Sequence, residues 1–169
     1  MKGKTSCASL RIPNDNERRE RMRDAYHESG HATAAWLMGV PIQRISLTPH
    51  PLVDNSKFVI GQIANESDPD TLAGIALTAI AGREAELLFD ASGPEHERRR
   101  DTTVARRALG CSNRFDEFYQ FTELRGLAQS ILSANWPLVT TLANELDRQG
   151  ELTGSECEAI LSNTLYGRA

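Results

Sequence analysis

The stretch AYHESGHATAAWLMG, residues 25–39, is the part of the chain around which the fold is predicted to form. It holds His27, Glu28 and His31 in the order H-E-x-x-H. Residues four apart lie on one face of a helix, so both imidazoles can reach a single ion. Two neutral imidazole ligands with a carboxylate general base beside them are typical of a zinc hydrolase. The alternative is a helix that carries two histidines by chance.

The helix that carries this pattern is predicted to begin after a cap at Asn14 or Asp15 and to run to about Met38. Gly39, followed by a valine and a proline, is a plausible stop. The apolar residues of the second half indicate that this half is buried, with the H-E-x-x-H residues at the edge of the buried face. Residues 1–15 are polar and are expected to form a flexible N-terminal arm.

Composition restricts the class of protein. The 169 residues suit one domain, here residues 16–169, and 40% hydrophobic with 25% charged residues is ordinary for a globular protein. A net charge of −4 argues against nucleic-acid binding. The three cysteines are far apart with no CxxC, which favours reduced thiols in a cytoplasmic protein. We recognise no signal peptide, no membrane span and no phosphate-binding loop of a nucleotide-driven motor.

Residues 43–64 predict two short strands in a hairpin or meander. Ile45 and Leu47 alternate with polar residues, Phe58 and Ile60 begin a second apolar run, and a Pro-rich and Asn-rich segment separates the two. A sheet this small leaves at least one strand edge unpaired. Such an edge beside a catalytic helix suits an extended peptide, and we place that substrate along residues 45–48. A purely structural hairpin is the alternative.

A second helix is predicted to follow the strands. Asp68 is a cap candidate and Pro69 suits the first turn. Residues 71–89 are rich in alanine and glycine, which allow close helix packing, so this helix is expected to be central and buried. Arg83 and Glu86 interrupt its late part, and such charges in a buried helix are expected to pair with a salt-bridge partner or a site ligand.

The segment EHERRRDTTVARRAL, residues 95–109, is predicted to form a third helix. Glu97 and Asp101 share a face with Val104 and Ala108. Carboxylates seldom point inward without a cation or a donor to meet them, so both are candidates for the site.

The last third is predicted to be helical, with helices over about 116–134, around Pro137 to Gly150, and over 155–161. Thr153 and Glu156 form a capping box for the last of these. The fold class is therefore mainly α (α+β): a single helical, zincin-like domain with a small two- to three-stranded β element.

Taken together, these stretches resemble the zinc peptidase domain of the FtsH-type AAA+ membrane proteases, here as a stand-alone domain without the ATPase module. Residues 27–32, HESGHA, are similar to that family's H-E-A-G-H-A. Residues 44–49 resemble its following strand, and residues 81–86, AGREAE, its Gly-Gly-Arg-x-A-E segment. The C-terminal helix pair resembles residues 136–161. The likeness spans roughly residues 20–162 of this chain.

The resemblance implies a third zinc ligand, which in the family is an Asp in the first turns of a helix after a Gly. Matching from Gly93, with Ala105 and Arg106 as a second anchor, places Glu97 at that position. Glu is an acceptable zinc ligand, although its extra methylene demands a longer reach. The expected metal set is therefore His27, His31 and Glu97, with Asp101 as an outer partner or as the real ligand.

The function implied is that of a zinc-dependent (Zn²⁺) metalloendopeptidase that cleaves flexible or unfolded polypeptides without ATP. Glu28 would act as the general base toward a metal-activated water. Partners would be a peptide or unfolded-protein substrate and a separate unfoldase or adaptor; the oligomeric state is open. The alternative is a non-proteolytic zinc-binding regulatory or scaffold module, against which the presence of Glu28 argues, because a structural zinc site has no use for it.

Overall fold

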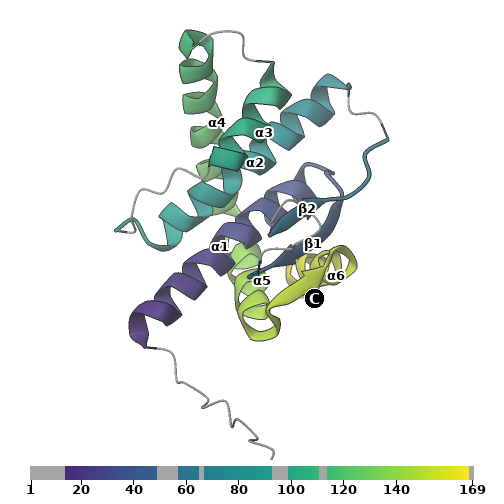
Figure 1. The fold of residues 1–169 in the computed structure, drawn as a ribbon. Coiled ribbons are helices and arrows are strands. Elements are labelled where there is room, and N and C mark those ends of the chain that lie inside the picture. The colour runs from purple at the N-terminus through teal and green to yellow at the C-terminus, as the bar shows by residue number, and fades with distance from the viewer. Residues whose placement is uncertain (1–13, 49–56, 65–66, 93–98, 111–113, 168–169) are drawn as a thin grey trace, which may run out of the picture.

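The computed structural model describes residues 14–48, 57–64, 67–92, 99–110 and 114–167. These form a mainly helical domain with one small antiparallel sheet, which confirms the predicted fold class (Figure 1). The elements are listed in chain order as α1 (Asp15–Leu37), β1 (Ile42–Ser46), β2 (Phe58–Ile60), α2 (Pro69–Phe89), α3 (Arg99–Leu109), α4 (Arg114–Ala134), α5 (Trp136–Gln149), β3 (Glu151–Thr153) and α6 (Gly154–Tyr166).

Helix α1 begins at a capping box. The side chain of Asn14 accepts a hydrogen bond from the backbone N–H of Glu17, and the Glu17 carboxylate accepts one from the backbone N–H of Asn14. The cap predicted at Asn14 or Asp15 is confirmed at Asn14, so the helix start takes the last two residues of the predicted arm 1–15. Residues 1–13 lie outside the described part. As predicted, the second half of α1 is buried. The two histidines lie well inside that buried half, because His27 is only 1% and His31 only 3% exposed.

Helix α2 packs closely along α1, as its small residues predicted. It begins after the N-cap Asp68, whose carboxylate accepts from the backbone N–H of Thr71, with Pro69 in the first turn. At the crossing, a Cβ added to Gly30 of α1 would lie 2.4 Å from Ala85 Cβ and 2.8 Å from Ala81 O. Only glycine at this position lets the two backbones approach so closely.

The sheet has the order β2-β1-β3, and both pairs are antiparallel. The predicted pairing of the first two strands is confirmed, and Ile45 lies opposite Phe58 of β2 and Leu152 of β3. The predicted fold class allowed for a third strand, but the sequence did not place it at Glu151–Thr153. Together with α6 it lies beside β1 (Figure 1).

The predicted substrate edge at residues 45–48 is wrong, because β1 is the central strand. The backbone N–H of Ser46 donates to Lys57 O at 2.8 Å, and that of Leu47 donates to Gly150 O at 2.9 Å. The chain's own residues from two other segments thus occupy both sides of β1. An added peptide would find no open edge there.

The buried side chains form two clusters. The larger one joins α1, the sheet, α5 and α6 and includes Ile45, Leu142, Leu146, Leu152 and Leu161. The smaller one joins α2, α3 and α4 and consists of Leu77, Ala79, Ile80, Ala105, Phe121 and Ala128. The contact of α1 with α2 connects the two clusters. Within the described residues, every helix is too short or too polar to cross a bilayer.

Candidate metal centre

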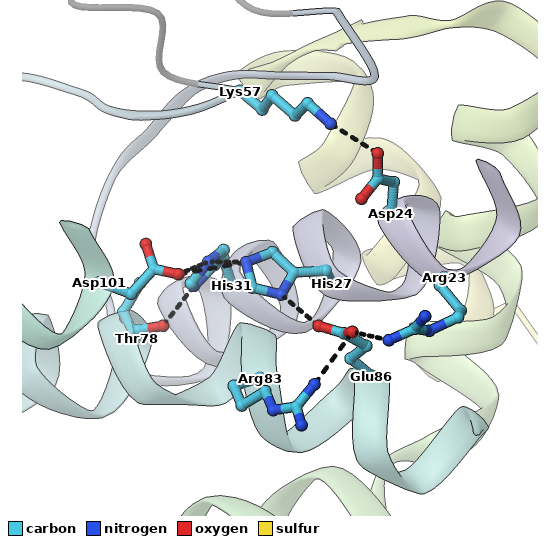
Figure 2. A network of polar contacts seen from close by, with 9 residues as sticks. All are labelled: Arg23, Asp24, His27, His31, Lys57, Thr78, Arg83, Glu86 and Asp101. Carbon is cyan, nitrogen blue, oxygen red and sulfur yellow. Dashed lines mark hydrogen bonds and ion pairs between the residues drawn. The ribbon is translucent and has the colours of Figure 1, made fainter. Parts of the chain in front are cut away.

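Three side chains from two helices converge between the two buried clusters. His27 and His31 come from α1, and Asp101 comes from the first turn of α3 (Figure 2). The two Nε2 atoms are 3.0 Å apart, and Asp101 Oδ2 lies 3.2 Å from His27 Nε2 and 3.6 Å from His31 Nε2. With zinc–ligand bonds of about 2.0–2.1 Å, neighbouring ligand atoms of a tetrahedral site are roughly 3.3–3.4 Å apart. The triangle therefore has the size of one face of a zinc tetrahedron.

The Nδ1 atom of each imidazole, which faces away from Asp101, already has a hydrogen-bond partner. His31 Nδ1 lies 2.7 Å from the backbone carbonyl of Thr78, and His27 Nδ1 lies 3.3 Å from Glu86 Oε2. A carbonyl or carboxylate oxygen only accepts hydrogen bonds, so in each neutral ring Nδ1 carries the hydrogen. Both Nε2 atoms are then left with a lone pair, which is the form of histidine that binds metals.

Two imidazole lone pairs and a carboxylate oxygen consequently face one another in a buried place. Asp101 Oδ2 is buried and faces the two Nε2 atoms, neither of which carries a hydrogen while the neutral rings carry theirs on Nδ1. Such an arrangement is repulsive unless a cation, either protons or a metal ion, lies among the three atoms. Two nitrogens and one oxygen are a donor set that suits zinc, so the residues present fit the metal expected from the sequence.

The electrostatics of the site favour positive charge. Burial alone would lower the pKa of His31, but the charge and hydrogen bond of Asp101, together with the charge of Glu28 and the bond to Thr78, raise it to about 9. Burial would likewise raise the pKa of Asp101, and the two histidines hold it well below its usual range instead. The buried acidic charge around His31 therefore favours a cation at this point.

Glu28 lies next to His27 in the chain and is 3% exposed. Its negative charge is one of the causes that raise the pKa of His31, which places its carboxylate within electrostatic reach of the ligands. The sequence prediction put Glu28 beside the two histidines, and its burial at this point of α1 agrees with that.

Gly82 and Phe58 shape the space around His31. A Cβ added to Gly82 of α2 would lie 2.4 Å from His31 Nε2 and 2.5 Å from Cε1, so the imidazole occupies the place of a missing side chain. On the other side, the ring of Phe58 stacks on His31 with centroids 5.2 Å apart. Neither residue was predicted to belong to the site. The position of Gly82 inside a predicted helix was the one feature that could have indicated a close contact there.

Of the charged residues late in α2, Arg83 and Glu86 lie beside the metal centre, whereas Glu84 contacts α4. Glu86 Oε1 accepts from Arg23 Nη2 and lies 3.0 Å from Arg83 Nη1, so Glu86 connects two guanidinium groups to His27. Glu84 instead accepts from Gln129 Nε2 of α4 at 2.6 Å, outside the metal centre. The sequence predicted ion-pair or hydrogen-bond partners for Arg83 and Glu86. It did not indicate that Arg23, one helical turn before His27, would be one of them.

The structure thus brings together His27, His31 and Asp101, three of the residues that the sequence offered as candidate metal ligands. Glu97, the carboxylate we favoured as third ligand, lies outside the described residues. Neither the scan against protein-family models nor the search of curated proteins finds a match for this chain.

Proposed function

We propose that the protein is a zinc-dependent hydrolase, and more specifically a metallopeptidase, whose metal is held by His27, His31 and Asp101. The observation that carries this proposal is the convergence of both Nε2 atoms and Asp101 Oδ2 at 3.0–3.6 Å, with both Nδ1 atoms already bound to acceptors. A permanent arrangement of three acceptors in a buried place requires a cation. The unused fourth position of such a site is the one that a catalytic zinc leaves for water.

We take Asp101 as the third ligand in place of Glu97. Asp101 lies in the first turn of α3, and its Oδ2 is within 3.6 Å of both Nε2 atoms. A carboxylate ligand in the first turns of a helix is what the likeness to the FtsH-type peptidases implied. The shorter aspartate side chain also matches that family's ligand better than Glu97 does.

Glu28 has the role of general base. His27, His31 and Asp101 would hold the zinc, which when bound would lower the pKa of a water molecule and polarise the substrate carbonyl. The Glu28 carboxylate accepts the proton of the attacking water and passes it to the amine that leaves. Glu86 and Thr78 accept from the Nδ1 atoms of His27 and His31 and so direct both Nε2 atoms toward the metal position.

The substrate we propose is a flexible or unfolded polypeptide bound as an added strand. Among the described strands, β2 lies at one side of the sheet and β1 fills the middle. Phe58 of β2 stacks on His31, so the outer side of β2 is the strand edge next to the metal centre. An extended peptide there gains backbone hydrogen bonds while its scissile bond reaches the ligands.

A cytoplasmic setting remains part of this proposal. Cys157 is a free, buried thiol on α6, and burial together with neighbouring acidic charge raises its pKa to about 12. Such a thiol is kept as an inert part of the core and fits a reducing compartment.

A non-proteolytic zinc-binding module is the second candidate. The deep burial of His27 and Glu28, 1% and 3% exposed, is the observation that favours it, because closed zinc sites are structural. The two candidates differ in what they require of Glu28. A peptidase needs its carboxylate, whereas a structural site needs only the three ligands.

The test combines metal analysis with one substitution. Purified protein should hold about one zinc per chain, as one set of three ligands implies. Glu28→Gln should keep the zinc and lower the rate of casein or peptide hydrolysis by at least about 100-fold, in the range of general-base removal. Protein without bound zinc would overturn both candidates. Zinc-loaded wild type that cleaves no better than Glu28→Gln would leave only the binding module.

A further inference from the structure

We propose that Arg23 is a positioning residue of the metal centre. It holds the Glu86 carboxylate in the orientation in which Oε2 accepts from His27 Nδ1, and thereby keeps His27 Nε2 available to the metal. This inference rests on the metal centre proposed above. It adds a residue that neither the H-E-x-x-H pattern nor the family likeness assigns.

The contacts form a chain that is visible in Figure 2. Arg23 precedes His27 by one turn of α1 and is 8% exposed, and its Nη2 donates to Glu86 Oε1. Arg83 Nη1 lies 3.0 Å from the same oxygen. The other oxygen, Oε2, is 3.3 Å from His27 Nδ1. Both guanidinium groups thus share one carboxylate oxygen, and the imidazole has the other.

This division of the two oxygens fixes the direction of the carboxylate. Glu86 has rotatable side-chain bonds, and an unrestrained carboxylate could turn away from His27. The Nδ1 atom would then lack its acceptor, and the neutral ring could carry its hydrogen on Nε2 instead, where it blocks metal binding. Outer partners of this kind set the tautomer and the ring orientation of metal-bound histidines.

Burial is a second reason to assign Arg23 a specific role. An ion pair taken out of water gains little net stability, because desolvation opposes the attraction between the charges. Arg23 and Glu86 are 9% and 3% exposed in their side chains. An ion pair at the surface could join α1 to α2 equally well. The buried position of the Arg23–Glu86 pair therefore indicates a role toward His27, which Glu86 contacts.

The chain contains a matched control for this pair. Arg19, one turn before Arg23 on α1, pairs with Asp90, the C-cap residue of α2 four residues after Glu86, with Nε and Oδ2 2.7 Å apart. Arg19 also donates to Ser92, and its side chain is 60% exposed. The two ion pairs join the same helices, but only that of Arg23 continues to a histidine. Arg19→Met therefore measures the effect of losing an ion pair between α1 and the end of α2, without a change at His27.

The experiment measures zinc affinity of the full chain by competition with a chromophoric chelator. Arg23→Met should weaken zinc binding about 10- to 100-fold, the usual effect of losing an outer partner. Arg19→Met should stay within about twofold of wild type, because the Arg19 side chain is mostly exposed and its pair with Asp90 does not continue to His27. Arg23→Lys, which retains the charge but not the planar guanidinium fork, should recover part of the loss.

Long-range proton–nitrogen spectra of the zinc-loaded protein give a readout that a purely structural role would not change. In wild type, the His27 Nδ1–H should exchange slowly with solvent; in Arg23→Met it should exchange much faster. If Arg23→Met does not fold, Arg83→Met, which removes a more exposed guanidinium from the same oxygen, should still weaken zinc binding several-fold.

The outcomes separate this inference from the proposed function. If wild type and the Arg23 and Arg83 variants bind zinc equally, the positioning role is overturned and the metal centre stands. If Arg19→Met weakens zinc as much as Arg23→Met, the effect belongs to helix pairing, and the positioning role is again overturned. If wild type binds no zinc, the metal centre itself fails.

Discussion

Asp101 and Glu97 lie one helical turn apart in sequence, and this spacing explains why the sequence left the third ligand open. On the helix predicted for residues 95–109 both would face the same way, and both carry a carboxylate. Only the placement of α3 against α1 brings Asp101 Oδ2 to 3.2 Å from His27 Nε2. Two candidates on one face cannot be distinguished by spacing alone, because the distance between helices is a tertiary property.

Substitution of the two carboxylates gives a prediction for the third ligand. Asp101→Asn should weaken zinc binding by more than the roughly 10- to 100-fold of an outer partner, because it removes a charged ligand. Glu97→Gln should change it only several-fold. Zinc affinity measured with a competing chelator decides between them, and the reverse order would restore Glu97 as the ligand.

His27, Glu28 and His31 could be predicted from the sequence because their spacing and the helix period define their relative positions. The remaining contacts of the site could not. The partner of His31 Nδ1 is a backbone carbonyl, that of Thr78, and every residue has one. The space beside His31 exists because Gly82 lacks a side chain. The carbonyl gives no residue-specific signal, and the glycine within a predicted helix does not show which side chain fills the space beside it.

Helix α3 is the element on which the site depends most. It packs along α2 in the smaller buried cluster, and Asp101 reaches from its first turn to the histidines of α1. A bound metal therefore links an element of the smaller cluster to one of the larger cluster.

Removal of the metal should accordingly loosen α3. Without the metal, the Asp101 end of the helix loses its strongest attachment to α1, and backbone amides of residues 99–109 should exchange hydrogen faster. Amides of α5, which belongs to the larger cluster, provide the internal control. Hydrogen exchange with and without a chelator measures both. Equal exchange of α3 in the two states would contradict this coupling.

The helices could be predicted largely because their ends carry local signals. The caps at Asn14, Asp68 and Thr153 are all formed by side chains as the sequence indicated. Strand β3 was missed because it has three residues, of which only Leu152 is buried. Its pairing with β1 depends on contacts between distant parts of the chain. The last helix runs to Tyr166, beyond the predicted end at 161. The prediction stopped too early because the final turn is mostly exposed and lacks an apolar pattern.

At the scale of the whole molecule, the junction of β3 and α6 with β1 completes the larger cluster. Gly154 lies at this junction, and a Cβ there would be 1.9 Å from Ile42 O. The backbone carbonyl cannot move aside as a flexible side chain would. This close approach therefore depends on the absence of a side chain.

Gly154→Ala should destabilise the protein by about 1–3 kcal/mol, as overpacking of a close contact does. Gly126 is the control, because it lies exposed within α4 and a Cβ there meets no atom within 4 Å. Gly126→Ala should stabilise by about 0.5–1 kcal/mol through helix propensity. Urea unfolding of the zinc-free proteins measures both. A Gly154→Ala protein as stable as wild type would show that the β3–β1 contact can relax.

The pairing of Arg44 in β1 with Thr153 in β3 has a consequence for the order of synthesis. All three proposed ligands have left the ribosome once residue 101 has emerged. Strand β3, which flanks β1, and helices α5 and α6, which pack beside α1, are synthesised only after that. Because the core closes through such distant contacts, the nascent chain presents its histidines before it has a folded framework to hold them. We therefore expect a metal to bind late in folding, once β3 and α6 have joined β1.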